Sequence, residues 1–226
     1  MTAGAWDIPY EDRLIEGPEL EPIDLDELKK QRRVSSTSLD TLFDLWASAS
    51  RQKFEEETSL QLITAQRVFL LDEAPCESRI MFSRGPVQSI VRVDYVDSSG
   101  VVQELDSANY QMIPAVATVD TYPTPGGIQL INSATWPIVD TRAQAIRIYY
   151  MAGYGSVFGS VPEIIKYALM QYVGAFHRFG EEVTEKELYQ LPEGARQVIS
   201  ECKGRMRRTV FPRRSSTSAM TMQSWA

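Results

Sequence analysis

The hydrophobic pattern of this 226-residue chain changes its period twice, and these changes limit the folds that it can adopt. From Leu39 to Phe54 apolar residues recur every three to four positions, the spacing of an amphipathic helix. Between about residues 60 and 153 they occur instead in short alternating or continuous runs, which are typical of strands. After Pro162 the helical spacing returns. We therefore expect an α+β fold: a small helical bundle with an inserted antiparallel β-sheet or sandwich region, an extended N-terminal arm and a C-terminal tail.

These patterns divide the chain into five consecutive segments. The first is an acidic extended arm over residues 1–23, because Pro9, Pro18 and Pro22 discourage a helix there. The others are N-terminal helices over 24–58, a β region over 59–155, C-terminal helices over 156–206 and a basic, flexible tail over 207–226. Strands are predicted at 60–72, 79–83, 89–97, 101–106, 107–113, 127–131 and 145–153, and helices at 24–33, 38–58, 162–180 and 192–208.

The long helix at 38–58 is predicted to begin with Ser38 as its N-cap. Its apolar residues, among them Trp46 and Phe54, would form one buried face. The charged residues expected on the opposite, solvent-facing side are Asp40, Asp44, Arg51 and Glu55.

The sequence contains no group of residues with the spacing of a catalytic or cofactor-binding motif. Its single histidine is His177, and Cys76 and Cys202 fit neither a metal site nor a disulfide framework. The glycines at 153, 155 and 159 lack phosphate-loop spacing and predict a strand-to-helix turn with positive φ. No run approaches the roughly 20 apolar residues that span a membrane, and the acidic N-terminus is not a signal peptide. We therefore predict a protein that is not an enzyme, holds no cofactor or metal and has no membrane partner.

Charge is distributed unevenly along the chain, whose net charge is −7. Residues 1–30 hold nine acidic and three basic residues, whereas the sequence after Glu201 holds six basic residues and no acidic one. Charged ends of opposite sign indicate interaction tails, with solubility as the simpler alternative. For the C-terminal tail we favour a partner, because its arginines are mixed with Met206, Phe211 and Trp225.

An ordered series of short segments runs through residues 24–206: RGPVQSI at 84–90, VDYVD at 93–97 with a hairpin to Leu105, NYQ at 109–111, WP at 136–137, IRIYYMAGYG at 146–155 and VPEIIKYA at 161–168. This series resembles the head–tail connector proteins (adaptor, or head-completion, proteins) of tailed bacteriophages, a family also found in gene-transfer particles. No single motif is diagnostic; the resemblance lies in the order. The arm before residue 24 and the tail after 206 extend beyond it.

The resemblance implies a structural virion protein that assembles in the host cytoplasm and lies in the neck, between the capsid portal and the tail. Such subunits form a homo-oligomeric ring, usually a dodecamer, under the portal protein; packaged DNA passes through the ring, and a stopper or tail-completion protein attaches below. Portal contacts would come from Lys203, Arg205, Arg207, Arg208, Phe211, Arg213, Arg214 and Trp225. Subunit contacts would come from Trp46, Phe54, Phe176 and His177, and contacts to the next ring from Thr118, Asp120 and Tyr122 in the loop 115–126.

Two other functions remain open from the sequence. A stopper or tail-completion protein of the neck would also form a ring but would bind tail proteins in place of the portal. A DNA-binding module would act through the basic tail, with an affinity that falls steeply with salt. The acidic body argues against this second alternative, because it repels DNA.

Overall fold

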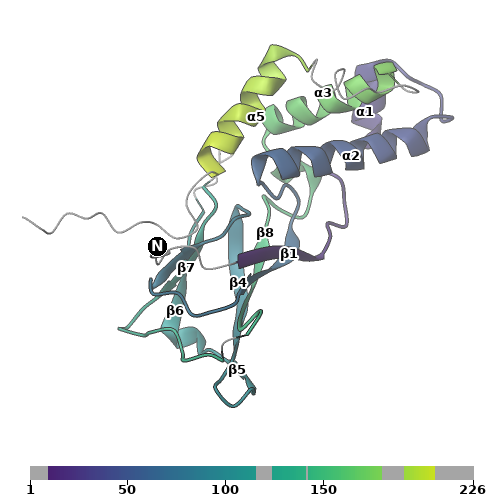
Figure 1. Ribbon diagram of the computed structural model, residues 1–226. Helices are drawn as coiled ribbons and strands as arrows, with labels where there is room; N and C mark the ends of the chain where they lie inside the picture. Colours follow the sequence, from purple (N-terminus) through teal and green to yellow (C-terminus); the bar gives the residue numbers. More distant parts are fainter. Residues whose placement is uncertain (1–9, 116–123, 141, 180–190, 207–226) are drawn as a thin grey trace, which may run out of the picture.

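The computed structural model describes residues 10–115, 124–140, 142–179 and 191–206. A layer of helices lies at one end of a β region made of two packed sheets (Figure 1). The α+β class expected from the sequence is therefore confirmed. The helices are α1 (Leu25–Arg32), α2 (Asp40–Thr58), α3 (Glu163–Phe179) and α5 (Glu193–Met206). The strands are β1 (Tyr10–Glu16), β2 (Ala65–Leu71), β3 (Arg79–Met81), β4 (Val87–Val96), β5 (Val102–Glu104), β6 (Tyr110–Ile113), β7 (Gly127–Leu130) and β8 (Ile146–Ala152).

The two sheets are antiparallel and share one hydrophobic core. The larger sheet has the strand order β1-β2-β8-β4-β5, and the smaller has the order β3-β7-β6. Ile148 from β8 and Ile128 from β7 are both fully buried in the core between them. The ring of Phe82, which follows β3, stacks on the ring of Tyr150 with centroids 4.2 Å apart. The β region is thus a small sandwich, one of the two forms, sheet or sandwich, that the alternating runs left open.

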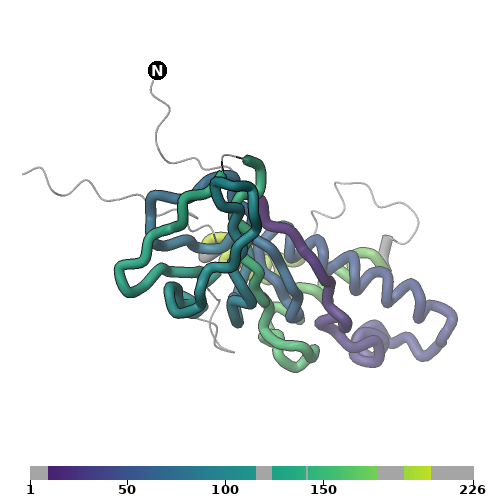
Figure 2. The backbone as a smooth tube through the Cα atoms, turned by 90° about the horizontal axis from the view of Figure 1, so that it is seen from below, coloured from purple at the N-terminus to yellow at the C-terminus, as the bar shows by residue number. Residues whose placement is uncertain are grey.

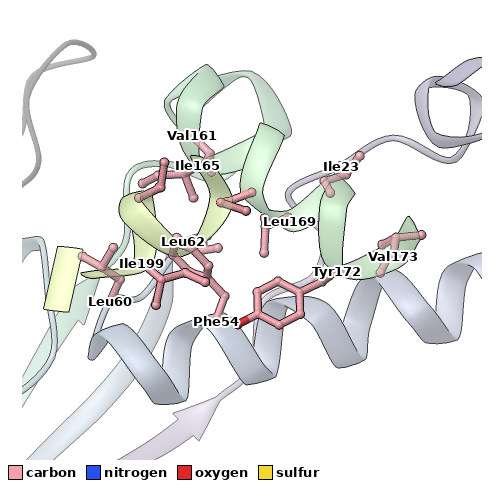
Figure 3. Close-up of a cluster of buried hydrophobic side chains, with 14 of the residues drawn as sticks. Ile23, Phe54, Leu60, Leu62, Val161, Ile165, Leu169, Tyr172, Val173 and Ile199 are labelled. Carbon is pink, nitrogen blue, oxygen red and sulfur yellow. The ribbon is translucent and has the colours of Figure 1, made fainter. Parts of the chain in front are cut away.

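A second hydrophobic core lies between the helices (Figure 3). Phe54 of α2 and Leu169 of α3 are completely buried in it. Leu60 and Leu62, which follow α2 on the way to β2, contribute to the same core. The start of α2 lies beside the end of α3, because the His177 ring is 5.5 Å from that of Phe43. These two helices therefore run in opposite directions.

Each strand and helix predicted from the sequence is present, but one strand was not predicted. The expected extended arm contains β1, which pairs with β2 from Tyr10↔Leu71 to Glu16↔Gln66 and forms an edge of the larger sheet. In Figure 2 this segment runs along the side of the molecule, from the β region towards the helices. The arm is therefore part of the fold over these residues.

Two predictions about α2 were wrong. Arg51 and Glu55, expected in solvent, are both buried, because the arm and the segment after α2 cover that side of the helix. The N-cap is Leu39 and not Ser38. The Ser38 backbone N–H donates to the Ser36 hydroxyl (3.2 Å), so the chain completes a turn before the helix begins.

Candidate assembly surfaces

A buried polar network fastens the N-terminal arm to the sheet, and its centre is Asp12 of β1. The Asp12 carboxylate is only 6% exposed and accepts a hydrogen bond from Arg67 Nε at 2.9 Å. Its second oxygen accepts from the Tyr150 hydroxyl at 2.8 Å and from the Ser83 hydroxyl. A short acidic strand with mostly exposed side chains is thus held by a buried carboxylate, and its Tyr10 ring also stacks on Phe69 with centroids 5.1 Å apart.

The network continues to the helices through Glu55. One carboxylate oxygen of Glu55 accepts from the Leu62 backbone N–H (2.8 Å) and the Gln61 side-chain amide (3.1 Å). The other accepts from Arg51, 3.0 Å away. Arg51 also donates to Glu21 of the arm at 2.8 Å. The arm is therefore tied to both parts of the molecule, to the sheet by Asp12 and to α2 by Glu21.

The two halves of this network meet at Gln61. Its side-chain oxygen accepts from Arg67 at 3.0 Å, so hydrogen bonds run without a break from the sheet to α2. Burial raises the pKa of Glu55, although the Leu62 N–H and Arg51 oppose the shift. Burial also raises the pKa of Tyr150 well above its ordinary value, with the Asp12 charge acting in the same direction. Both groups act as structural hydrogen-bonding partners that fix the junction between helices and sheets.

Of the four residues predicted for subunit contacts, Trp46 and His177 meet at one end of the helical layer, and Phe176 precedes His177 in α3. The His177 ring lies edge-on to the Trp46 ring, with centroids 5.8 Å apart, and Trp46, Phe176 and His177 are each half-buried. Phe54 is 0% exposed inside the helical core, so its side chain is closed to a neighbouring subunit. We call the remaining three the helix-end cluster.

Two exposed apolar side chains lie on the same helix: Leu42, which was wrongly expected on its buried face, and Leu45, which the sequence did not single out. Leu45 of α2 is 61% exposed and Leu42 is 41% exposed. Leu42 fits the helical spacing of a buried face, but local spacing does not reveal that no described part of the chain covers these two side chains. A further exposed group lies at the opposite end of α3, where Ile164 and Tyr167 follow Val157 and Phe158. The helical layer thus has apolar surface near both ends.

Of the other predicted contact residues, only Lys203 and Arg205 lie in the part of the chain that the structure describes. Lys203 is exposed on α5, and Arg205 lies in the last turn of the same helix. Arg207, Arg208, Phe211, Arg213, Arg214 and Trp225 lie outside the described residues, as do Thr118, Asp120 and Tyr122.

Within the described ranges no helix is long and apolar enough to span a membrane. Over the same part of the chain, no three or more His, Cys, Asp and Glu side chains are grouped so as to hold a metal ion.

The fold and its surfaces define a class of protein: a helical layer on a two-sheet β sandwich, with apolar helix ends and an arm locked into the sheet edge. The same fold occurs in solved structures of gene transfer agent (GTA) particles. A chain in the neck of an empty GTA particle, solved with C6 symmetry, superposes with a TM-score of 0.69 at 15% identity over 85% of this chain and 95% of that one.

Two further structures agree with this likeness. A chain of the native GTA virion gives a TM-score of 0.66 at 14% identity, over 84% of this chain and 93% of that one. A chain in the neck of the native particle, solved with C12 symmetry, gives 0.59 at 14% identity over 84% and 95%. No family model and no curated protein matches the sequence. Because the sequence identities are this low, the superpositions establish a common fold and nothing more specific.

Proposed function

We propose that this protein is a structural component of a virion neck: a head–tail connector (adaptor) that forms a ring under the portal. The observation that carries the proposal is the likeness to chains of GTA necks, which extends over nearly their whole length. The connector-like order of sequence segments supports the same reading independently. Packaged DNA would pass through the ring, whose acidic body disfavours tight binding of the phosphate backbone.

Ring formation requires two different surfaces on each subunit, because contacts in a ring are heterologous. The helix-end cluster with Leu42 and Leu45 offers one such surface. The exposed group from Val157 to Tyr167, near the other end of α3, is suited to be its counterpart. The 13 positions from Ile164 to His177 separate the two ends by about 20 Å along the helix, at 1.5 Å a residue. One end of a subunit would then contact the opposite end of the next.

This arrangement predicts that Leu45→Asp prevents ring assembly without unfolding the subunit. Leu45 has little apolar contact to lose in the monomer, so we expect its free energy of unfolding to change by less than about 0.5 kcal/mol. A charge in the middle of an apolar contact would have to be desolvated, which opposes association. Sedimentation velocity and electron microscopy measure the assembly. Val91→Asp, at a position on β4 that is also about half exposed, is the matched control and should assemble normally.

The portal contact is assigned to the end of α5 and the tail that follows it: Lys203, Arg205, Arg207, Arg208, Phe211, Arg213, Arg214 and Trp225. Arginines bind carboxylates in two-point contacts, and an aromatic side chain among them adds apolar area. The stopper or tail-completion protein would attach on the opposite side, with the loop around Thr118, Asp120 and Tyr122 as its contact.

A pull-down against the purified portal ring, imaged by electron microscopy, tests the function. The full-length protein should seat coaxially on the portal. Deletion of residues 203–226 should abolish binding while circular dichroism and urea unfolding show a folded subunit. A full-length variant with Arg207, Arg208, Arg213 and Arg214 replaced by Gln should also fail to bind. Undiminished binding of both variants would refute the role of the tail, and rings that cap tail tubes but not portals would identify a stopper or tail-completion protein.

A further inference from the structure

The outer edge of β1 combines an open backbone with exposed apolar side chains. β1 is the edge strand of the larger sheet, and among the residues that the structure describes it pairs on one side only, with β2. Leu14 and Ile15 are about half exposed on this strand, and so is Leu20 just after it. Unpaired backbone groups on an edge strand can hydrogen-bond to another extended segment. The arm therefore has both parts of a surface for binding an extended chain.

The same stretch carries negative charge that its neighbours do not neutralise. Glu16, Glu19, Asp24 and Asp26 are exposed, and over the described part of the chain none of them forms an ion pair. No basic residue occurs between Arg13 and Lys29. The other acidic residues in the described part of the arm are paired: Glu11 with Arg13, Asp12 with Arg67 and Glu21 with Arg51. We call residues 14–26 the acidic strip.

The chain contains one segment of complementary character, its own C-terminus. The sequence after Glu201 has six basic residues and no acidic one, and it includes Val210 and Phe211. α5 ends at Met206, and 20 residues follow. An extended chain of that length reaches about 66 Å. A globular domain of this size has a radius of gyration of only about 17 Å, so the tail is long enough to reach the strip on its own subunit.

We propose that in the free subunit the basic tail docks along the acidic strip of the same chain. Guanidinium groups would pair with the unpaired carboxylates, and Phe211 would cover exposed leucine and isoleucine side chains. Attachment to the same chain gives the tail an effective concentration of the order of millimolar, which favours it over the tail of a second copy. The docked tail is withheld from other anionic partners until one of them competes for it. This proposal does not rest on the proposed function, because it concerns the subunit alone.

Zero-length cross-linking tests the contact in the full-length protein. Arg213→Lys keeps the positive charge and supplies an amine, and a carbodiimide joins that amine to a carboxylate in direct contact with it. The reaction is run on an equimolar mixture of ¹⁴N- and ¹⁵N-labelled protein, and mass spectrometry identifies the linked peptides. We expect links from position 213 to Glu16 or Glu19 in which both peptides carry the same isotope. Their yield should fall about fivefold or more between 50 and 500 mM salt, because exposed ion pairs are screened.

Matched variants separate this contact from random collisions. Glu16→Gln with Glu19→Gln should remove those links, whereas Glu56→Gln with Glu104→Gln, which changes the same number of exposed carboxylates elsewhere, should leave them unchanged. Links of mixed isotope would overturn the proposal in favour of the tail of a second copy. Links absent from the strip, or spread evenly over exposed acids, would overturn docking altogether. Neither result would affect the portal pull-down, so the two proposals fail separately.

Discussion

Asp12→Ala is expected to lower the free energy of unfolding by about 3–5 kcal/mol, the cost of breaking a buried ion pair by removing one partner. The substitution leaves the Arg67 side chain, which is 9% exposed, without the carboxylate that neutralises its guanidinium. It also removes the acceptor for the Tyr150 and Ser83 hydroxyls. Urea unfolding followed by circular dichroism measures the loss.

The neighbouring residue provides the control. Glu11 points away from this network and contacts Arg13 in solvent, so Glu11→Ala should leave the urea midpoint unchanged. Asp12→Asn should fall between the two, because its side-chain oxygen can still accept a hydrogen bond while the charge facing Arg67 is lost. If Asp12→Ala unfolds at the same urea concentration as Glu11→Ala, the carboxylate does not anchor the arm.

The importance of Asp12 could not be predicted from the sequence, and the reason is physical. Its partners are distant: Arg67 lies 55 residues away and Tyr150 lies 138 residues away. The strand that carries it has mostly exposed side chains and therefore lacks the alternation of a half-buried strand. Local pattern reveals elements that bury a face. β1 instead forms through one buried carboxylate, the stacking of the Tyr10 ring on Phe69 and its pairing with β2.

The same limit explains why Arg51 and Glu55 of α2 were wrongly predicted to face solvent. Helical spacing predicted a helix over residues 38–58, close to the observed Asp40–Thr58, because the apolar repeat depends only on the helix itself. Burial of each face depends on what packs there. Glu21 and Leu62, from segments before and after α2, cover Arg51 and Glu55, whereas nothing in the described chain covers Leu45. An exposed apolar position and a buried ion pair on one helix are both tertiary effects.

For related reasons, some of the residues predicted to form subunit contacts lie at the surface and one lies in the core. Trp46 and His177 were both predicted to form subunit contacts, and the antiparallel packing of α2 and α3 brings their rings together. Phe54 lies two turns further along α2, where α5 and the segment after α2 close over the helix, so it belongs to the core. The role of the tail residues in binding the portal was inferred from the composition of the tail and the family resemblance, and it remains a prediction.

A turn predicted from the glycines, between the last strand and α3, produces the second large effect. Gly153 has a φ of +136°, a conformation that residues with a side chain rarely adopt, as the sequence indicated. A Cβ atom there would lie 2.5 Å from the Thr64 backbone nitrogen and 2.7 Å from the Ile63 carbonyl carbon. The Gly153 N–H also donates to the Pro86 carbonyl at 2.8 Å, so the backbone cannot move aside without losing this bond.

We therefore expect Gly153→Ala to cost about 3 kcal/mol or more in the free energy of unfolding, combining backbone strain with a clash against fixed backbone atoms. Gly159→Ala is the matched control, because its added methyl meets no atom within 4 Å. Its effect should stay within about 0.5 kcal/mol, as at other exposed positions. Thermal and urea unfolding of the two variants give the comparison. Gly153 lies where the end of β8 crosses the segment between α2 and β2. Equal stability of the two variants would therefore mean that the backbone at this crossing can shift at little cost in free energy. The helices would then not be held rigidly on the β region.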